Sequence, residues 1–308
     1  MEKLDDFKEA YLKIQPVLQD ACRKKFIPHI TGFVTIRPDK TPVQFGSGVL
    51  LQIAGSHFVL TAAHIFDETT KYKLPIGIIT GLNDDPALFI DNKEVLAFSV
   101  RRDRFDVCAI RLSREMADIM LSKGRRFCTL SDADPLDMTS QQGKKVWYAV
   151  FGFPASNQRM IDEGTILYSR AQFYCSTTFD NQKNELDRIS GFDPKVHIAI
   201  HFERSDAADC DGKASKLPHP SGMSGCGVWR MTDDIPSITS CDVSKAKLVG
   251  IETGFVEKFN CMKATKLIMA VKLIYEGFPD LRSAIKLNFQ PPAKFIQPVE
   301  FRLLLPRA

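Results

Sequence analysis

Hydrophobic positions recur every three or four residues at the start of the chain. The residues that follow this spacing are Leu4, Phe7, Tyr11, Ile14, Leu18 and Cys22. The spacing is typical of an amphipathic helix, and Pro16 interrupts or bends that helix because proline lacks a backbone N–H. We therefore expect a helical extension over residues 1–28. It either packs on the rest of the protein as a structural helix or serves, through residues 2–24, as a docking element for a regulatory protein partner.

From residue 30 the pattern changes to short runs of β-branched and aromatic residues, separated by Gly, Pro, Asn and Asp. Such runs are typical of strands. Six of them precede residue 115: "HITGFVTIR", "FGSGVLLQIA", "HFVLTAA", "LPIGIITGL", "KEVLAFSVR" and "DVCAIRL". Six more follow a helical or irregular connector: "KKVWYAVFGF", "GTILYSRAQFY", "KVHIAIHFE", "GCGVWRM", "AKLVGIETGF" and "TKLIMAV". Two such sets predict an all-β fold of two six-stranded antiparallel barrels, in which closure removes exposed strand edges.

These patterns divide the chain into five parts. We expect the N-terminal helical extension over residues 1–28, a first β-barrel over 29–115, a connector over 116–145, a second β-barrel over 146–272, and a C-terminal helix and tail over 273–308. The pattern of a closing helix covers residues 271–285 and is interrupted near Gly277 and Pro279. The proline-punctuated tail is expected to run extended over the surface.

Composition and charge exclude several classes of function. A net charge of +4, from 41 basic and 37 acidic residues, is too small to indicate binding to nucleic acid. No hydrophobic run reaches the roughly 18 to 20 residues of a membrane span, and the N-terminus lacks the hydrophobic region of a secretory signal. The eight cysteines form no CxxC pair and share no metal-ligand spacing with the six histidines. We expect no metal, no cofactor and a reducing, cytoplasmic compartment.

Two polar residues stand at the ends of hydrophobic runs. His64 follows the run "VLTAA" and precedes a short helical turn, so its imidazole is expected to face a cleft. A lone histidine is, however, more often structural or exposed than catalytic. Asp106 begins the run "DVCAIRL", and it should have a partner because burying an unpaired carboxylate is costly. The competing acid is Asp103 in the charged run "RRDR", which is expected to be solvated.

The stretch "HPSGMSGCGVW", residues 219–229, places Ser224 among glycines just before a strand-like run. Gly222 and Gly225 permit backbone conformations that strain other residues, so the stretch can be a tight turn that leads into a buried strand. It can equally present Ser224 as a nucleophile. The stretch alone leaves both interpretations open.

Four motifs together resemble a known family. In chain order they are "TAAH", "DVCAIRL", "GMSGCGVW" and "LVGIETG". Their order and context are similar to those of the chymotrypsin/trypsin-like serine proteases, and most similar to bacterial, non-secreted trypsin-like peptidases. The resemblance spans about residues 30–285, and "VWYAVFGFP" resembles the opening strand of the family's second barrel.

The resemblance assigns roles to individual residues. It implies that Ser224 is the nucleophile, that His64 is the general base and that Asp106 orients the base. A serine hydroxyl needs such a base because it is a poor nucleophile at neutral pH, and histidine can take the proton and return it to the leaving amine. The resemblance also implies that the backbone N–H groups of Gly222 and Ser224 form the oxyanion hole.

Two residues depart from the family pattern. Digestive members have an aspartate immediately before the nucleophile, and a newly cleaved N-terminus pairs with it. Here that residue is Met223, which cannot make the ion pair, so we expect no zymogen cleavage of that type. Cys226 stands where a glycine is usual, and a small side chain should be tolerated there.

The resemblance also implies how a substrate binds. Thr253, Gly254 and Phe255 match the strand that pairs with an extended peptide. If the carboxylate of Glu252 enters the primary specificity pocket, an Arg or Lys residue is preferred by charge pairing, and this weak preference is our expectation. His219 and Ser221, on the opposite wall, would instead favour an acidic or amide side chain. Glu252 can also point away, towards solvent or a neighbouring strand.

The sequence therefore predicts a serine endopeptidase with a protein or peptide substrate, restricted in what it cleaves. The alternative is a protease-like binding or regulatory module that acts through a protein partner. Loss of one member of the catalytic set is the usual sign of such a module, and here all three are present. A cysteine nucleophile would have to stand at position 224, and Cys226 is displaced from it by two residues.

Overall fold

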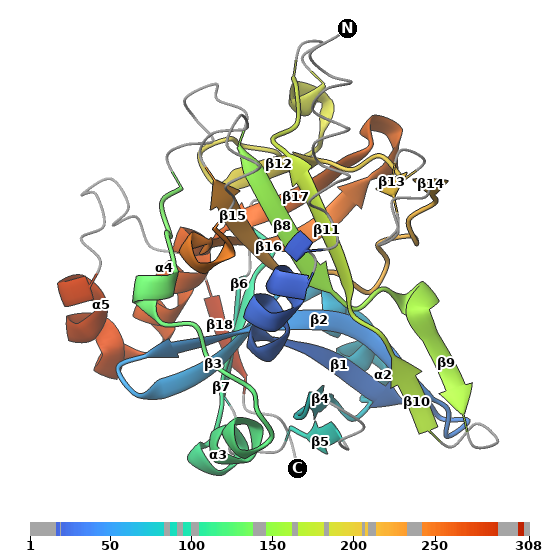
Figure 1. Ribbon diagram of the computed structural model, residues 1–308. Helices are drawn as coiled ribbons and strands as arrows, with labels where there is room; N and C mark the ends of the chain where they lie inside the picture. Colours follow the sequence, from blue (N-terminus) through green and yellow to red (C-terminus); the bar gives the residue numbers. More distant parts are fainter. Residues whose placement is uncertain are drawn as a thin grey trace, which may run out of the picture.

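Two large antiparallel sheets make up most of the protein (Figure 1). The computed structural model describes residues 17–18, 20–82, 87–90, 95–99, 105–137, 146–161, 166–181, 185–204, 207–208, 214–232, 242–288 and 301–304. The first sheet contains the blue and teal strands of Figure 1, and the second contains mainly green to orange strands. Both sheets are curled, and the predicted all-β fold with two antiparallel barrels is confirmed.

The first sheet has eight strands where the sequence predicted six. Their order is β18-β6-β7-β3-β2-β1-β4-β5. The strands are β1 (Ile30–Ile36), β2 (Pro42–Ile53), β3 (Ser56–Thr61), β4 (Gly77–Ile79), β5 (Ala87–Phe89), β6 (Val95–Ser99), β7 (Cys108–Arg111) and β18 (Phe301–Leu304). The two additional strands are β5 and β18. The described part of the predicted surface tail is thus a strand that pairs with β6 and covers its edge.

The second sheet has six strands in the order β11-β8-β15-β16-β17-β12. They are β8 (Trp147–Gly152), β11 (Gln172–Thr177), β12 (His197–His201), β15 (Gly227–Thr232), β16 (Lys247–Val256) and β17 (Cys261–Lys266). An antiparallel bridge between Thr178 and Ile200 links the two ends of this sheet. Two small hairpins lie outside it: β9 (Gln158–Ile161) with β10 (Ile166–Ser169), and β13 (Ala207–Ala208) with β14 (Ala214–Ser215).

One predicted strand is wrong in its position. The run "TKLIMAV" contributes only its first two residues to β17, and the rest begins helix α4. A short hydrophobic run cannot be assigned to a strand or a buried helix by periodicity alone. The sheet consequently ends at Lys266, before the boundary expected at residue 272.

Helices are short: one lies within the first set of strands, one between the two sets and two after the second set. They are α2 (Asp67–Tyr72), α3 (Arg114–Ser122), α4 (Leu267–Gly277) and α5 (Arg282–Asn288). Single 3₁₀ turns are η1 (Ile27–His29), η2 (Ala63–Phe66), η3 (Leu130–Asp132), η5 (Ala155–Asn157), η6 (Leu186–Arg188), η8 (Val243–Lys245), η9 (Glu257–Phe259) and η10 (Pro279–Leu281). The closing helix is interrupted after Gly277 and at Pro279, as the sequence predicted.

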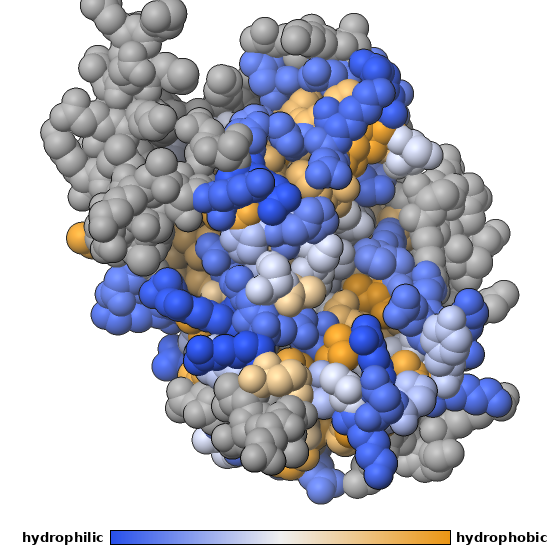
Figure 2. All heavy atoms as spheres, turned by 90° about the vertical axis from the view of Figure 1, so that its right-hand side faces the viewer, coloured by the Kyte–Doolittle hydropathy of each residue, from blue (hydrophilic) through white to orange (hydrophobic). Residues whose placement is uncertain are grey.

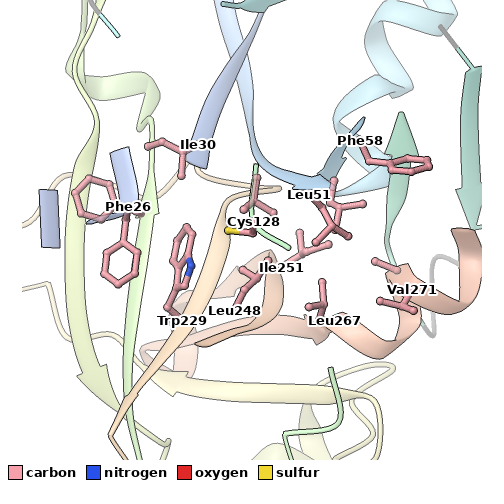
Figure 3. Close-up of a cluster of buried hydrophobic side chains, with 14 of the residues drawn as sticks. Phe26, Ile30, Leu51, Phe58, Cys128, Trp229, Leu248, Ile251, Leu267 and Val271 are labelled. Atoms are coloured by element: carbon pink, nitrogen blue, oxygen red, sulfur yellow. The ribbon is translucent and has the colours of Figure 1, made fainter. Parts of the chain in front are cut away.

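The N-terminal helix packs into the hydrophobic core through its described part. Residues 20–26 are helical, whereas residues 2–16 of the predicted helix lie outside the described residues. Leu18, Cys22 and Phe26 are buried in a cluster that draws side chains from both sheets. The ring centroid of Phe26 lies 4.7 Å from that of Trp229 (Figure 3). The described part therefore has a structural role.

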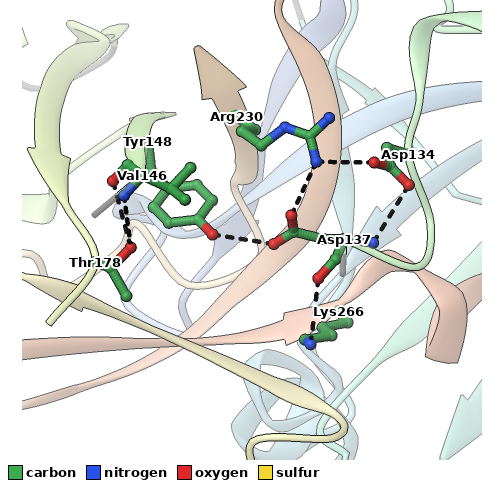
Figure 4. A network of polar contacts seen from close by, with 7 residues as sticks. All are labelled: Asp134, Asp137, Val146, Tyr148, Thr178, Arg230 and Lys266. Atoms are coloured by element: carbon green, nitrogen blue, oxygen red, sulfur yellow. Dashed lines mark hydrogen bonds and ion pairs between the residues drawn. The ribbon is translucent and has the colours of Figure 1, made fainter. Parts of the chain in front are cut away.

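A buried ionic network ties the connector to the second sheet (Figure 4). Arg230 donates hydrogen bonds to the carboxylates of Asp134 (2.8 Å) and Asp137 (3.1 Å). The hydroxyl group of Tyr148 donates to the other carboxylate oxygen of Asp137 at 3.0 Å, and Lys266 Nζ donates to its backbone carbonyl at 3.5 Å. Asp137 is fully buried, and Arg230 and Tyr148 supply the donors that its buried carboxylate requires.

The surface is mainly hydrophilic on the face at the right of Figure 1. Figure 2 shows this face as a mosaic in which hydrophilic side chains surround small, separate hydrophobic areas. Within the described residues, no helix combines the length and the hydrophobicity needed to cross a membrane. The same part of the chain contains no group of His, Cys, Asp or Glu side chains arranged to hold a metal ion.

Candidate active site

Pairing of β3 with β7 brings His64 and Asp106 together. Thr61 at the end of β3 is paired with Cys108 at the start of β7, so a residue just after β3 lies beside one just before β7. Asp106 Oδ1 accepts a hydrogen bond from the backbone N–H of His64 at 2.9 Å. Asp106 Oδ2 is hydrogen-bonded to His64 Nδ1. The carboxylate thus fixes both the backbone and the ring of His64.

The environment of His64 favours a histidine that can gain a proton. Its side chain is 40% exposed, whereas that of Asp106 is 10% exposed. Burial lowers the pKa of His64, but the hydrogen bond to Asp106 and the charges of Asp106, Glu252 and Asp67 outweigh this and raise the pKa above its ordinary value. Because Nδ1 faces a carboxylate, neutral His64 holds its hydrogen there and presents Nε2 as an acceptor.

The turn that contains Ser224 requires both of its glycines. Gly222 and Gly225 have φ angles of +87° and +93°, a region that L-residues with a Cβ rarely adopt. A Cβ at Gly225 would lie 1.9 Å from the hydroxyl oxygen of Thr61. The turn therefore packs directly against the end of β3, three residues before His64.

Ser47 of β2 holds this turn in place, and sequence reasoning missed it. Its N–H donates to the carbonyl of Ser224 at 2.9 Å, and its hydroxyl group donates to the carbonyl of Gly222 at 2.9 Å. The same hydroxyl oxygen accepts from the N–H of Phe153, and the Ser47 carbonyl accepts from Thr61 Oγ1 at 2.7 Å. The sequence signal for Ser47 was a polar residue within the hydrophobic run "FGSGVLL". The structure shows that this residue is fully buried.

The backbone around Ser224 leaves two N–H groups available. The carbonyl of Ser221 accepts from Ala155 at 2.7 Å, and the carbonyl of Met223 accepts from Cys226 at 2.9 Å. Because a trans peptide is planar, with C=O and N–H on opposite sides, the N–H groups of Gly222 and Ser224 point away from those partners. Within the described residues neither N–H donates to a protein acceptor, and Ser224 Oγ makes no hydrogen bond.

The residue before Ser224 is held by hydrophobic packing. Met223 is 2% exposed and belongs to a buried cluster that includes Leu217, Cys226 and Val228. Methionine carries no charge, so this position offers no partner for a charged N-terminus. The expectation that no activation cleavage occurs stays a prediction.

Residues expected to contact a substrate gather in two places. His219 and Ser221 are hydrogen-bonded to each other, with 2.7 Å between His219 Nδ1 and Ser221 Oγ, and the ring of His219 lies edge-on to Phe255 at 5.7 Å. In β16, pairing with β15 ends at Ile251, whereas pairing with β17 continues to Val256. In the part of the chain that the structure describes, Thr253, Gly254 and Phe255 therefore form a strand edge without a partner on one side.

Glu252 lies beneath the turn of Ser224 and is shielded from solvent. It is 1% exposed, which excludes the solvent-facing alternative for its carboxyl group. Its carbonyl accepts from Gly225 at 2.8 Å and its N–H donates to Cys226 at 2.9 Å. Burial raises the pKa of Glu252 to about 7, and the nearby charge of His64 opposes this increase.

The chain was compared with known proteins. Its sequence matches no family model and no curated protein. The HL collagenase structure is 14% identical over 82% of this chain and 94% of that chain, with a TM-score of 0.44. The VesB protease of Vibrio cholerae is 15% identical over 82% and 64%, with a TM-score of 0.46. A Glu endopeptidase in complex with MPD is 11% identical over 80% and 89%, with a TM-score of 0.42. These sequence identities and TM-scores are too low to indicate an activity. The function is therefore inferred from the residues of the chain itself.

Proposed function

We propose that the protein is a serine endopeptidase in which Ser224 is the nucleophile, His64 the general base and Asp106 the residue that orients the base. The observation that carries the proposal is the pair of hydrogen bonds that the Asp106 carboxylate accepts from the backbone N–H and from the ring of His64. A buried aspartate that fixes the tautomer and orientation of the imidazole is what a serine–histidine–aspartate set requires.

The mechanism follows from these groups. Ser224 Oγ attacks the peptide carbonyl while His64 Nε2 takes its proton, and Asp106 stabilises the imidazolium that forms. The N–H groups of Gly222 and Ser224 bind the oxyanion, and loss of one such donor typically costs about 10²- to 10³-fold in rate. His64 then returns the proton to the leaving amine, and water releases the acyl group. Catalytic hydrogen bonds are often long in unliganded enzymes, so Ser224 and His64 are expected to approach on substrate binding.

The substrate is proposed to be an extended peptide segment of a restricted protein target. It would pair with the open edge of β16 at Thr253, Gly254 and Phe255, where backbone groups supply affinity. The preference for Arg or Lys stays a prediction, and the burial of Glu252 weakens it. A carboxyl group with a pKa of about 7 is mostly neutral below pH 7 and gives a basic side chain little charge to pair with.

A reducing, cytoplasmic location is part of the proposal. Cys128, Cys226 and Cys261 are buried free thiols, and burial raises the pKa of Cys128 and of Cys261 to about 12. Such thiols behave as small hydrophobic side chains. They would be retained unchanged in a compartment where disulfides do not form.

Labelling with a fluorophosphonate probe tests the proposed activity. The native protein should react at Ser224, Ser224→Ala should not react, and His64→Ala should react roughly 10²- to 10⁴-fold more slowly because the base is lost. Ser244→Ala, which removes an exposed serine, serves as the matched control and should react like the native protein. Failure of the folded native protein to react, or equal reaction of Ser224→Ala, would favour a binding module that acts through a protein partner.

A further inference from the structure

Glu252 is a buried carboxyl group that the proposed mechanism does not use. Its Oε2 is inaccessible to solvent and has no hydrogen-bond partner within the described residues. An ionised carboxylate without partners is strongly disfavoured in such a place. The environment of this side chain therefore favours the neutral acid.

Backbone hydrogen bonds fix Glu252 next to the nucleophile turn. The carbonyl and N–H of Glu252 are bonded to Gly225 and Cys226, the two residues that follow Ser224. The backbone N–H of Gly254 favours the ionised form of this carboxyl group, but its effect on the pKa is smaller than that of burial. The position of the carboxyl group relative to Ser224 is consequently set by the sheet, not by a mobile loop.

Four titratable groups interact electrostatically with the carboxyl group of Glu252. They are His64 on η2, Asp106 before β7, Lys263 on the adjacent strand β17, and Cys226 in the turn before β15. His64 and Lys263 favour the carboxylate, whereas Asp106 and burial favour the neutral acid. Burial is the largest effect, and it also raises the pKa of Cys226, which therefore stays an uncharged thiol.

Ionisation of Glu252 changes the pKa of His64 in one direction, upwards. The negative charge of ionised Glu252 raises the pKa of His64, in addition to the effect of Asp106. Asp106 and Asp67 also raise the pKa of His64, so ionisation of Glu252 adds a further negative charge to theirs. Groups that interact in this way titrate as a coupled set.

We propose that Glu252 is a positioning residue whose buried carboxyl group holds a proton beneath the turn of Ser224, and that stabilises the imidazolium form of His64 once this proton has left for solvent. The catalytic consequence rests on the proposed peptidase function, whereas the coupling itself does not. The site thereby contains a second group, besides His64, that ionises near neutral pH. The pKa of His64 then depends on whether Glu252 is ionised.

Nuclear magnetic resonance titration of the His64 imidazole tests the coupling without any need for activity. In the native protein the His64 signals should show two inflections, one for its own proton and one for that of Glu252. In Glu252→Gln, which keeps the size of the side chain and removes its ionisation, one inflection should remain and His64 should titrate at lower pH. Glu257→Gln, an exposed acid in η9 just beyond β16, is the matched control and should leave the curve unchanged.

The outcomes separate this inference from the proposed function. A single inflection in the native protein, or an unchanged His64 curve in Glu252→Gln, overturns the role of Glu252 even if the probe labels Ser224. The number of inflections is measured on the native protein alone, so it tests the role of Glu252 even if Glu252→Gln does not fold. If the probe labels Ser224, the acid limb of the labelling rate should shift to lower pH in Glu252→Gln. Coupling without any labelling would leave the inference standing and remove the peptidase.

Discussion

Single residues decide whether the backbone around Ser224 can take its shape. Gly222 turns the peptide so that two N–H groups have no acceptor among the residues that the structure describes, and Ser47 holds the carbonyls on either side of Met223. Gly225 allows the turn to pack against Thr61, because a Cβ at position 225 would overlap with the Thr61 side chain. The precision of the candidate site therefore depends on groups that do no chemistry themselves.

Replacing Gly225 by alanine should impair both stability and labelling of Ser224. The added Cβ would meet Thr61 Oγ1 at 1.9 Å and the carbonyl oxygen of Ser47 at 2.1 Å, in addition to the strain at φ +93°. Gly55→Ala is the matched control, because Gly55 has φ +80° but nothing within 4 Å of the new Cβ. The control should lower the free energy of unfolding by about 1 kcal/mol, the usual cost of left-handed backbone, and should label normally.

Urea unfolding and labelling rates measure this comparison. We expect Gly225→Ala to lose considerably more stability than Gly55→Ala, and to lose reaction with the probe. Equal losses of stability in the two variants would show that the turn can move away from β3, which contradicts the tight packing described above.

At the scale of elements, strand pairing places the base and its partner. Register between β3 and β7 makes neighbours of two segments that are 42 residues apart in sequence. The N-terminal helix contributes in another way, since its buried face fills the core between the two sheets. Its described part therefore stabilises the framework that holds both halves of the site.

Phe26→Ala should destabilise the whole protein. Phe26 is fully buried, with ring centroids 4.7 Å from Trp229 and 6.2 Å from Phe151, and truncation of a buried phenylalanine costs about 3–5 kcal/mol. Val17→Ala is the control on the same segment, because Val17 is 75% exposed and an exposed substitution costs within about 0.5 kcal/mol. Chemical denaturation gives both values. A loss for Phe26→Ala no greater than that for Val17→Ala would show that this helix is only docked on the surface.

At the scale of the whole molecule, the candidate site is shared between the sheets. His64 and Asp106 lie in segments that adjoin strands of the first sheet. Ser224 lies just before β15 of the second sheet, and Glu252 lies in β16 of that sheet. The burial and the neighbouring charges that determine the protonation of Glu252 are consequently brought together only in the folded protein. Global stability should therefore respond to the proton on Glu252.

Stability should fall as the pH rises from about 4.5 to about 7, the ordinary and the raised pKa of Glu252. In this window the folded state binds a proton that the unfolded state releases, so raising the pH favours unfolding. At 1.36 kcal/mol per pKa unit, the full penalty above pH 7 is about 3 kcal/mol. Glu252→Gln lacks this penalty.

Urea unfolding at pH 5 and pH 8 measures the effect. The raised pKa of His64 acts in the same direction, so the decisive quantity is the difference between Glu252→Gln and the native protein at each pH. We expect this difference to favour the variant more at pH 8 than at pH 5, while Glu257→Gln shows no such change. The same difference at both pH values would mean that Glu252 is ionised throughout.

Alternating and continuous hydrophobic runs were sufficient to predict most strands and the all-β fold, because burial on a pleated sheet selects residues locally. They did not predict β18, whose partner β6 is some 200 residues earlier in the chain. They also misassigned "TKLIMAV", because a fully buried helix and a buried strand have the same hydrophobic pattern. The local hydrophobic pattern therefore does not predict strand pairing between segments that are distant in the sequence.

The sequence by itself determined the chemistry available: a serine between glycines, a histidine after a strand, an aspartate before another, and an uncharged methionine next to the serine. The tertiary structure alone decided which of these groups meet. It joined Asp106 to His64, set Ser47 under the turn of Ser224, and buried Glu252 near both charges. Hydrogen bonds, burial and pKa values depend on neighbours in space, and for this site those neighbours come from two different sheets.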